Sequence, residues 1–185
     1  MNNVSHSSDS LRKLSLKFII FVSILIIFSL LLNLSQKRVF SFGSDKIKWL
    51  NFQKAMKKNI NIKKPFLIWV HETGCEYCEL FKKNVLSKTI IIYKINKYFY
   101  PIKSNGYGNK KYLFFNGKMF NGKSLSAKFN VIGFPTTVFL NSDYKKIFTL
   151  PGYWDKKNFI LVLDWIGSGL YKKESLRRYF KSFSK

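Results

Sequence analysis

The amino-acid sequence predicts an α/β fold, in which a mixed central sheet has helices on both faces and one N-terminal transmembrane helix precedes it. From residue 45 onward, apolar patterns give a strand–helix–strand unit and then a strand–strand–helix unit, which together build a mixed sheet. Before this region, residues 18–34 form an apolar run without any charged residue. We therefore place one domain at residues 45–185, which is an ordinary domain size.

The N-terminal segment is predicted to be a membrane anchor. Residues 1–17 form a polar and basic tail, and as a helix the run 18–34 would span about 26 Å, slightly less than a bilayer core. The run is longer than the apolar part of a typical signal peptide, and Ser41-Phe42-Gly43 is a poor cleavage site. We therefore favour an uncleaved signal anchor over a cleaved signal, with residues 35–44 as a linker.

The orientation of this anchor follows from the lengths of the segments on its two sides. Basic residues flank the run on both sides, so the positive-inside rule is nearly balanced. A short tail and a long downstream domain favour the tail inside and the domain outside. The expected location is the inner membrane, with a single pass and the domain on the periplasmic side.

The first half of the domain is predicted from apolar spacing. Apolar residues recur at helical spacing before and after a short, continuously apolar stretch, which suits a buried central strand. The residues 87–99 fit a helix, although their isoleucines also suit a strand. The elements expected here are a helix at 45–58, a strand at 66–70, a helix at 76–86, a helix at 87–99 and a strand at 100–104.

The second half is predicted mainly from turn residues. Asn116-Gly117 is a favoured two-residue hairpin turn, and Asp155 and Ser124 are suitable residues to cap helices. The elements expected here are a loop at 105–109, a hairpin at 111–120, a helix at 124–129, a strand ending at Leu140, a strand at 146–150, a helix ending near Ile166 and an amphipathic tail at 176–183.

The strong positive charge does not by itself indicate a nucleic-acid partner. The formal net charge is +24, but nearly all of it comes from scattered lysines, and arginine, whose planar group suits phosphate best, is scarce. Lys, Asn, Ile, Phe and Tyr are all abundant together, which is typical of A/T-rich coding sequence. We therefore expect no nucleic acid among the partners. With only two cysteines, the chain cannot be a disulfide-stapled mini-protein either.

Those two cysteines, Cys75 and Cys78, have the C-x-x-C spacing at the predicted start of a helix. Free N–H groups and the helix dipole at that position stabilise a thiolate, and in such settings the thiol pKa falls from about 8.5 to roughly 3.5–7.5. Cys78 lies one turn later and is placed to attack a mixed disulfide formed by Cys75. Glu76 opposes the thiolate and favours a reducing couple, and Tyr77 offers an aromatic contact.

A C-x-x-C pair can also serve other purposes. Haem attachment requires histidine after the second cysteine, where this chain has Glu79. Structural zinc requires more ligands than the domain offers, and a structural disulfide across so short a loop stabilises little. A copper-carrying site of two thiolates, with His71 or Met119 as a further ligand, remains open. The favoured redox use needs no metal and no cofactor.

A strand followed by Gly74-Cys75-Glu76-Tyr77-Cys78 and a helix, with Val131 to Thr136 further along the chain, resembles the thioredoxin superfamily. The resemblance implies a thioredoxin-like three-layer fold in which Pro135 is cis and packs against the cysteines. It also implies that Phe134, Pro135 and Thr136, together with Tyr77, form the substrate-binding surface. Within the superfamily, the chain is most similar to membrane-bound or periplasmic thioredoxins linked to sulfur oxidation and to related thiol reductases.

The chain departs from the family pattern at two positions. Gly74 stands where ordinary thioredoxins have tryptophan, and Trp69 stands where they have the buried acid that accepts the proton of the second cysteine. The group that deprotonates Cys78 therefore stays open, with His71 and Glu72 as candidates.

The resemblance implies a membrane-anchored protein-disulfide oxidoreductase that works as a reductase. Its catalytic residues are Cys75 and Cys78, its substrates are protein thiols or disulfides, and a redox partner recycles it. A thioredoxin-like copper metallochaperone for an envelope protein is the alternative. A folding adaptor with incidental thiols is a third possibility.

Overall fold

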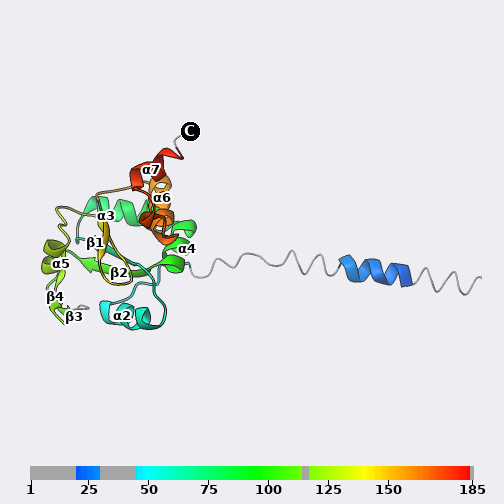
Figure 1. Cartoon of the computed structure of the whole chain (residues 1–185), viewed down its shortest axis with the longest axis horizontal. Helices are drawn as coiled ribbons and strands as arrows, with labels where there is room; N and C mark the ends of the chain where they lie inside the picture. The colour runs from blue at the N-terminus through cyan, green and yellow to red at the C-terminus, as the bar shows by residue number, and fades with distance from the viewer. Residues whose placement is uncertain (1–19, 30–44, 114–116, 184–185) are drawn as a thin grey trace, which may run out of the picture. The chain divides into compact units, whose positions relative to one another are not determined.

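The computed structural model describes residues 20–29, 45–113 and 117–183 (Figure 1). The chain divides into two units, 1–41 and 42–185, and each is considered by itself. In the first unit, residues 20–29 are helical and their side chains are exposed. No helix within the described ranges is both long and apolar enough to cross a bilayer. The rest of the predicted anchor, the tail and the whole linker lie outside the described residues, so the anchor stays a prediction.

The second unit contains a mixed four-stranded sheet, as predicted. The strand order is β2-β1-β5-β6, with bounds Phe66–His71 for β1, Tyr100–Asn105 for β2, Thr136–Leu140 for β5 and Lys146–Pro151 for β6. β1 pairs parallel with β2 and antiparallel with β5, and β5 pairs antiparallel with β6. The parallel pair requires the helical crossover between β1 and β2.

Helices cover both faces of the sheet, so the unit has three layers. One face is covered by α3, the π-helical turn that continues it, α4 and α6, and the other by α2 and α5. The bounds are Phe52–Asn61 for α2, Glu76–Phe81 for α3, Lys82–Leu86 for the π-helical turn, Thr89–Tyr98 for α4, Gly122–Lys128 for α5, Lys156–Gly167 for α6, Leu170–Lys172 for a short 3₁₀ turn and Leu176–Lys181 for α7.

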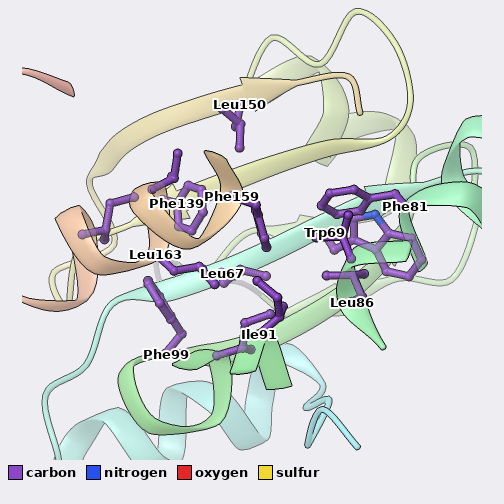
Figure 2. Close-up of a cluster of buried hydrophobic side chains, with 14 of the residues drawn as sticks. Leu67, Trp69, Phe81, Leu86, Ile91, Phe99, Phe139, Leu150, Phe159 and Leu163 are labelled. Carbon is purple, nitrogen blue, oxygen red and sulfur yellow. The ribbon is translucent and has the colours of Figure 1, made fainter. Parts of the chain in front are cut away.

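β1 is buried on both sides, which explains why its sequence is continuously apolar. Leu67 and Trp69 point into the buried cluster beneath α3, α4 and α6, and Figure 2 is a close-up of this cluster. Ile68 and Val70 point into the cluster beneath α2 and α5. The strand that leads to the cysteines is therefore fixed from both faces, and the position of its last residue, His71, is well defined.

The first helix begins later than the pattern predicted, at Phe52 and not at residue 45. Asn51 is its N-cap, because the Asn51 side chain accepts a hydrogen bond from the N–H of Lys54. Before this helix the chain is extended and Leu50 lies beside β2, where its N–H donates to the carbonyl of Pro101. The apolar residues before 52 belong to this extended segment, which the helical spacing could not reveal.

Two further elements refine the predictions. The short helix α5 begins at Gly122 and is capped by Asn121, and Ser124 is the third helical residue that completes a capping box. The predicted cap at Ser124 is therefore wrong by one turn. The hairpin is present as β3 (Tyr112–Leu113) and β4 (Met119–Phe120), and its turn at Asn116 lies outside the described residues.

Candidate active site

Cys75 and Cys78 form a disulfide at the start of α3, with their Cα atoms 5.2 Å apart. Cys75 is the N-cap of this helix, and its Sγ accepts a hydrogen bond from the backbone N–H of Cys78 at 3.1 Å. After reduction the same N–H points at the sulfur of Cys75, where it stabilises a thiolate together with the helix dipole. The predicted position of the pair at a helix entry is confirmed.

The two sulfurs differ in their access to solvent. Cys75 is partly exposed, whereas Cys78 is fully buried in the core cluster with Phe81 and Trp69. An incoming disulfide can reach Cys75 only. The roles expected from the spacing, Cys75 as the attacking thiol and Cys78 as the resolving one, stay predictions, and this difference in exposure supports them.

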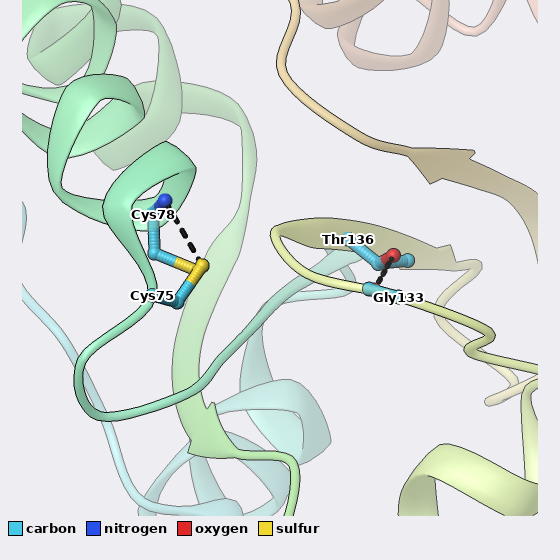
Figure 3. Close-up of a disulfide and its surroundings, with 4 residues drawn as sticks. All are labelled: Cys75, Cys78, Gly133 and Thr136. Atoms are coloured by element: carbon cyan, nitrogen blue, oxygen red, sulfur yellow. Dashed lines mark hydrogen bonds between the residues drawn. A yellow bond between two sulfur atoms is a disulfide. The ribbon is translucent and has the colours of Figure 1, made fainter.

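A loop at residues 131–135 lies opposite the disulfide (Figure 3). The Phe134–Pro135 peptide bond is cis, and Pro135 is buried. The N–H of Gly152, just after β6, donates to the carbonyl of Pro135 at 2.8 Å, and the hydroxyl of Thr136 donates to the carbonyl of Gly133 at 2.7 Å. The end of β6 and the start of β5 therefore both hold this loop in place.

The predicted substrate-binding residues differ in what a substrate could reach. Tyr77 is 62% exposed beside the disulfide and Phe134 is partly exposed, whereas the Thr136 side chain is fully buried. Thr136 therefore shapes the loop from inside, and its side chain cannot touch a substrate. These roles remain predictions, but the structure limits direct contact to the exposed residues.

Sequence reasoning missed the support beneath Phe134. Its ring lies where a Cβ on Gly106 would be, and the Tyr107 ring meets it edge-on with the centroids 5.3 Å apart. The loop Asn105 to Asn109 was predicted from its turn residues, but its contact with the proline loop depends on strand pairing. The N–H of Gly106 donates to the carbonyl of His71, which brings this loop to the end of β1.

Ile132 was also missed. It lies in the same loop as Phe134 and is 86% exposed, the highest value among the exposed large apolar side chains of the described residues. An isoleucine in a turn gives no distinctive sequence signal, since periodicity treats it as one more core residue. Ile132 in this loop and Tyr77 between the two cysteines are thus two large exposed side chains in the segments that meet at the disulfide.

Trp69 lies beneath the site, in the strand that precedes the cysteines. Its ring is buried between Trp49 and His71, with centroid distances of 5.8 and 4.8 Å, and the ammonium group of Lys103 lies 5.2 Å from its centroid. In the part of the chain that the structure describes, the Trp69 Nε1 is the only buried side-chain nitrogen or oxygen without a hydrogen-bond partner. An indole N–H only donates, so Trp69 cannot accept the Cys78 proton.

His71, one candidate proton acceptor, is partly buried at the end of β1. Burial first, and then the nearby ammonium group of Lys103, lower the pKa of His71 below its ordinary value of 6.5. The imidazole is therefore neutral at neutral pH and keeps a free lone pair. This suits a proton acceptor, although the stacking of His71 on Trp69 gives the residue a structural role as well.

A zinc site requires further ligands near the cysteines, whereas a copper site could consist of the two thiolates alone. Within residues 20–29, 45–113 and 117–183, no three His, Cys, Asp or Glu side chains gather closely enough to hold a metal ion. Met119 lies in the β3–β4 hairpin, which is a separate two-stranded sheet. The copper alternative, which can be built from the two cysteines alone, stays a prediction.

Comparison with known proteins agrees with this geometry. The sequence profile of a family described as a thioredoxin-like domain matches residues 52–166, which is more than half of the chain. The chain belongs to this thioredoxin-like family. No curated protein sequence matches it.

Several solved structures share the fold of this thioredoxin-like chain. A thioredoxin-fold protein from Helicobacter pylori is 28% identical, with a TM-score of 0.57, and the match covers 64% of this chain and 83% of that one. The DsbH oxidoreductase is 13% identical, with a TM-score of 0.55 over 70% of this chain and 90% of that one. A thioredoxin from Thermus thermophilus is 18% identical, with a TM-score of 0.54 over 65% and 87%. At the two lower identities, the likeness concerns the fold alone.

Family and site together define the chemistry. A thioredoxin-like domain with a bonded C-x-x-C pair at a helix entry is a protein-disulfide oxidoreductase. In thiol–disulfide exchange, a thiolate attacks one sulfur of a disulfide, a new S–S bond forms, and the other sulfur leaves as a thiolate.

Proposed function

We propose that this oxidoreductase acts as a protein-disulfide reductase, anchored in the inner membrane with its domain on the periplasmic side. In the reduced protein, the Cys75 thiolate attacks a substrate disulfide and one substrate sulfur leaves as a thiolate. The Cys78 thiolate then attacks the Cys75 sulfur and the second substrate thiolate leaves. The substrate gains two electrons and the pair is left as a disulfide, so a partner dithiol must reduce it again.

One observation carries this proposal. The partly exposed Cys75 sulfur accepts the N–H of Cys78 at the start of α3, while Cys78 is fully buried one turn further on. One sulfur is therefore activated and accessible, and the other is within bonding distance but shielded from a second substrate. A structural disulfide would need neither this activation nor this asymmetry.

The trapping experiment tests these roles. Cys78→Ser should stall as a mixed disulfide with its substrates when the full chain is expressed in cells, because the resolving thiol is absent. Cys75→Ser should form few such adducts, since Cys78 is buried and cannot be reached. Non-reducing gels followed by mass spectrometry identify the adducts. Equal trapping by both variants would contradict the assignment of the two cysteines.

The reductase direction rests on Glu76, which is exposed in the first turn of α3 directly after Cys75. Its carboxylate opposes the thiolate, and a less favoured thiolate gives a more reducing couple. Glu76→Gln should therefore raise the reduction potential, whereas Asp143→Asn in the β5–β6 turn should leave it unchanged. A wild-type potential near the roughly −120 mV of a strong oxidant would contradict the proposal.

The membrane anchor rests on the uncharged apolar run 18–34. The full chain should stay in the membrane fraction after alkaline extraction, and a variant that lacks residues 1–44 should not. Protease added to spheroplasts should digest the domain of the full chain. Protection from that protease would place the domain on the cytoplasmic side instead.

A further inference from the structure

The end of the sheet that carries the disulfide has a charge opposite to that of the chain as a whole. The protein has 33 lysines and arginines against 9 aspartates and glutamates. Nevertheless three of those acids, Glu72, Glu76 and Glu79, lie within or beside the C-x-x-C segment. The balance of acidic and basic residues at this end therefore differs from that of the whole chain.

Four segments converge at this end, and none of them contains a lysine or an arginine. The pairing of β1 with β2 places His71 opposite Asn105. The pairing of β5 with its two neighbours places Thr136 opposite both Val70 and Pro151. The segments without cations are 65–81, 104–109, 129–144 and 147–155. Many of their residues are buried, but the exposed ones around the disulfide also lack positive charge.

The carboxylates on this face are only partly neutralised. Glu79 pairs with Lys82 at 3.1 Å, on the side where Lys82 and Lys103 also act on His71. Among the residues that the structure describes, neither Glu72 nor Glu76 has a cation within ion-pair distance. The dipole of α3 favours a carboxylate at Glu76 in any case, but it explains neither Glu72 nor the missing lysines of the other loops.

Two large exposed side chains belong to the segments that meet at the disulfide. Ile132 is 86% exposed in the loop opposite the disulfide, and Tyr77 is 62% exposed beside it. A central apolar and aromatic contact with charges around it is the usual arrangement of a protein–protein interface. The acids and these two residues together indicate a docking face around Cys75.

We propose that this face selects protein partners whose reactive cysteine is flanked by lysine or arginine and by an apolar residue. The partner's apolar residue packs on Ile132 and Tyr77, and its cations approach Glu72 and Glu76. Opposite charges speed the encounter and like charges slow it, so an acidic partner is disfavoured here in spite of the +24 charge of the whole chain. This inference rests on the proposed function and adds its substrate class.

The test compares two disulfide-bonded peptides that differ only in the charge of the residues flanking their cysteines, lysine in one and glutamate in the other. Reduced full-length protein is mixed with each peptide, and the single-turnover rate constant is measured. The lysine peptide should react about tenfold faster at low salt, and the difference should shrink to about twofold in about 0.5 M salt. A glutamate peptide that reacts as fast, or faster, would show that the net charge governs the encounter and would overturn the proposal.

Matched variants test whether the glutamates of this face cause the preference for the lysine peptide. Glu72→Gln with Glu76→Gln should lower the ratio of the two rate constants at least threefold, and the ratio cancels any change in the intrinsic reactivity of the thiol. Asp143→Asn removes one carboxylate from the turn after β5, at the other end of that strand, and should leave the ratio unchanged. An unchanged ratio in the double variant would overturn the role of the two glutamates.

A binding measurement separates recognition from reaction. The Cys75→Ser/Cys78→Ser protein and fluorescent peptides with serine in place of cysteine cannot exchange disulfides. Tighter binding of the lysine peptide supports the inference, and equal or weaker binding overturns it. If this preference holds while the wild-type protein reduces neither peptide, the proposed reductase function fails and the docking face stands.

Discussion

At the scale of single residues, Gly106 determines where the Phe134 ring can lie. A Cβ at residue 106 would overlap that ring, so Gly106→Ala should displace Phe134 from the loop opposite the disulfide. We expect a loss of about 1–3 kcal/mol in the free energy of unfolding, as is usual for overpacking, and slower reduction of a protein substrate. Chemical denaturation and single-turnover kinetics measure the two effects.

The double variant Gly106→Ala/Phe134→Leu provides the control. If the overlap is the cause, the smaller leucine relieves it, and the second substitution costs less stability in the alanine background than in the wild type. Additive effects would mean that Gly106→Ala acts through the backbone of its own loop.

His71 should make the stability depend on pH. Its pKa is lowered below 6.5 in the folded protein, chiefly by burial and next by Lys103, so the unfolded chain binds the proton more readily. The stabilisation from neutral His71 is present above about pH 6.5 and is lost as the pH falls from there through the folded-state pKa. His71→Phe, which keeps a ring on Trp69, should lose less stability between about pH 7 and pH 5 than the wild type.

His6→Phe removes the other histidine of the chain and is the matched control. The stability of all three proteins is measured by urea denaturation between about pH 7 and pH 5, and His6→Phe should keep the wild-type dependence on pH. If His71→Phe also keeps the wild-type dependence on pH, protonation of His71 does not cause that dependence.

At the scale of elements, the start of α6 depends on Asp155. The Asp155 carboxylate accepts a hydrogen bond from the N–H of Asn158 at 3.0 Å, and this bond lowers the pKa of Asp155 below 3.8. Asp155→Ala should cost about 1 kcal/mol of stability, and Asp155→Asn much less, because asparagine also caps helices.

The pH dependence separates the charge of Asp155 from its capping bond. The contribution of the carboxylate is present above about pH 3.8 and is lost as the pH falls through its lower folded-state pKa. Asp155→Asn should therefore lose less stability than the wild type on acidification, as followed by circular dichroism. An equal loss in both proteins would show that the charge adds nothing to the cap.

At the scale of the whole molecule, the net charge of +24 should make stability depend on salt. Like charges repel one another in the compact state, and salt screens them over about 10 Å at 0.1 M. The melting temperature should rise between low and physiological salt. Lys156→Gln with Lys157→Gln, which removes two exposed cations from the first turn of α6, should reduce that rise. A melting temperature independent of salt would contradict this account.

The order of elements could be predicted because each depends on local patterns. The continuous apolar residues of β1, the turn residues after β2 and the cap at Asp155 are all local signals, and the structure confirms them. The start of α2 could not be predicted, since the extended residues before Asn51 are held by Pro101 and Asn96, far along the chain. The sequence pattern also fitted both a helix and a strand at residues 87–99. The structure has the helix α4 there, and its Ile91 and Ile95 lie in the same buried cluster as residues of α6.

The sequence by itself determined the reactive pair, because Cys75 and Cys78 lie within one helical turn and their bond depends on local geometry. The tertiary structure alone decided what faces that pair. The Pro135 loop, the Phe134 ring over Gly106, the exposed Ile132 and the four segments without lysine or arginine all come together where segments distant in sequence meet at one end of the sheet. Such meetings depend on strand order and register, which no local pattern contains.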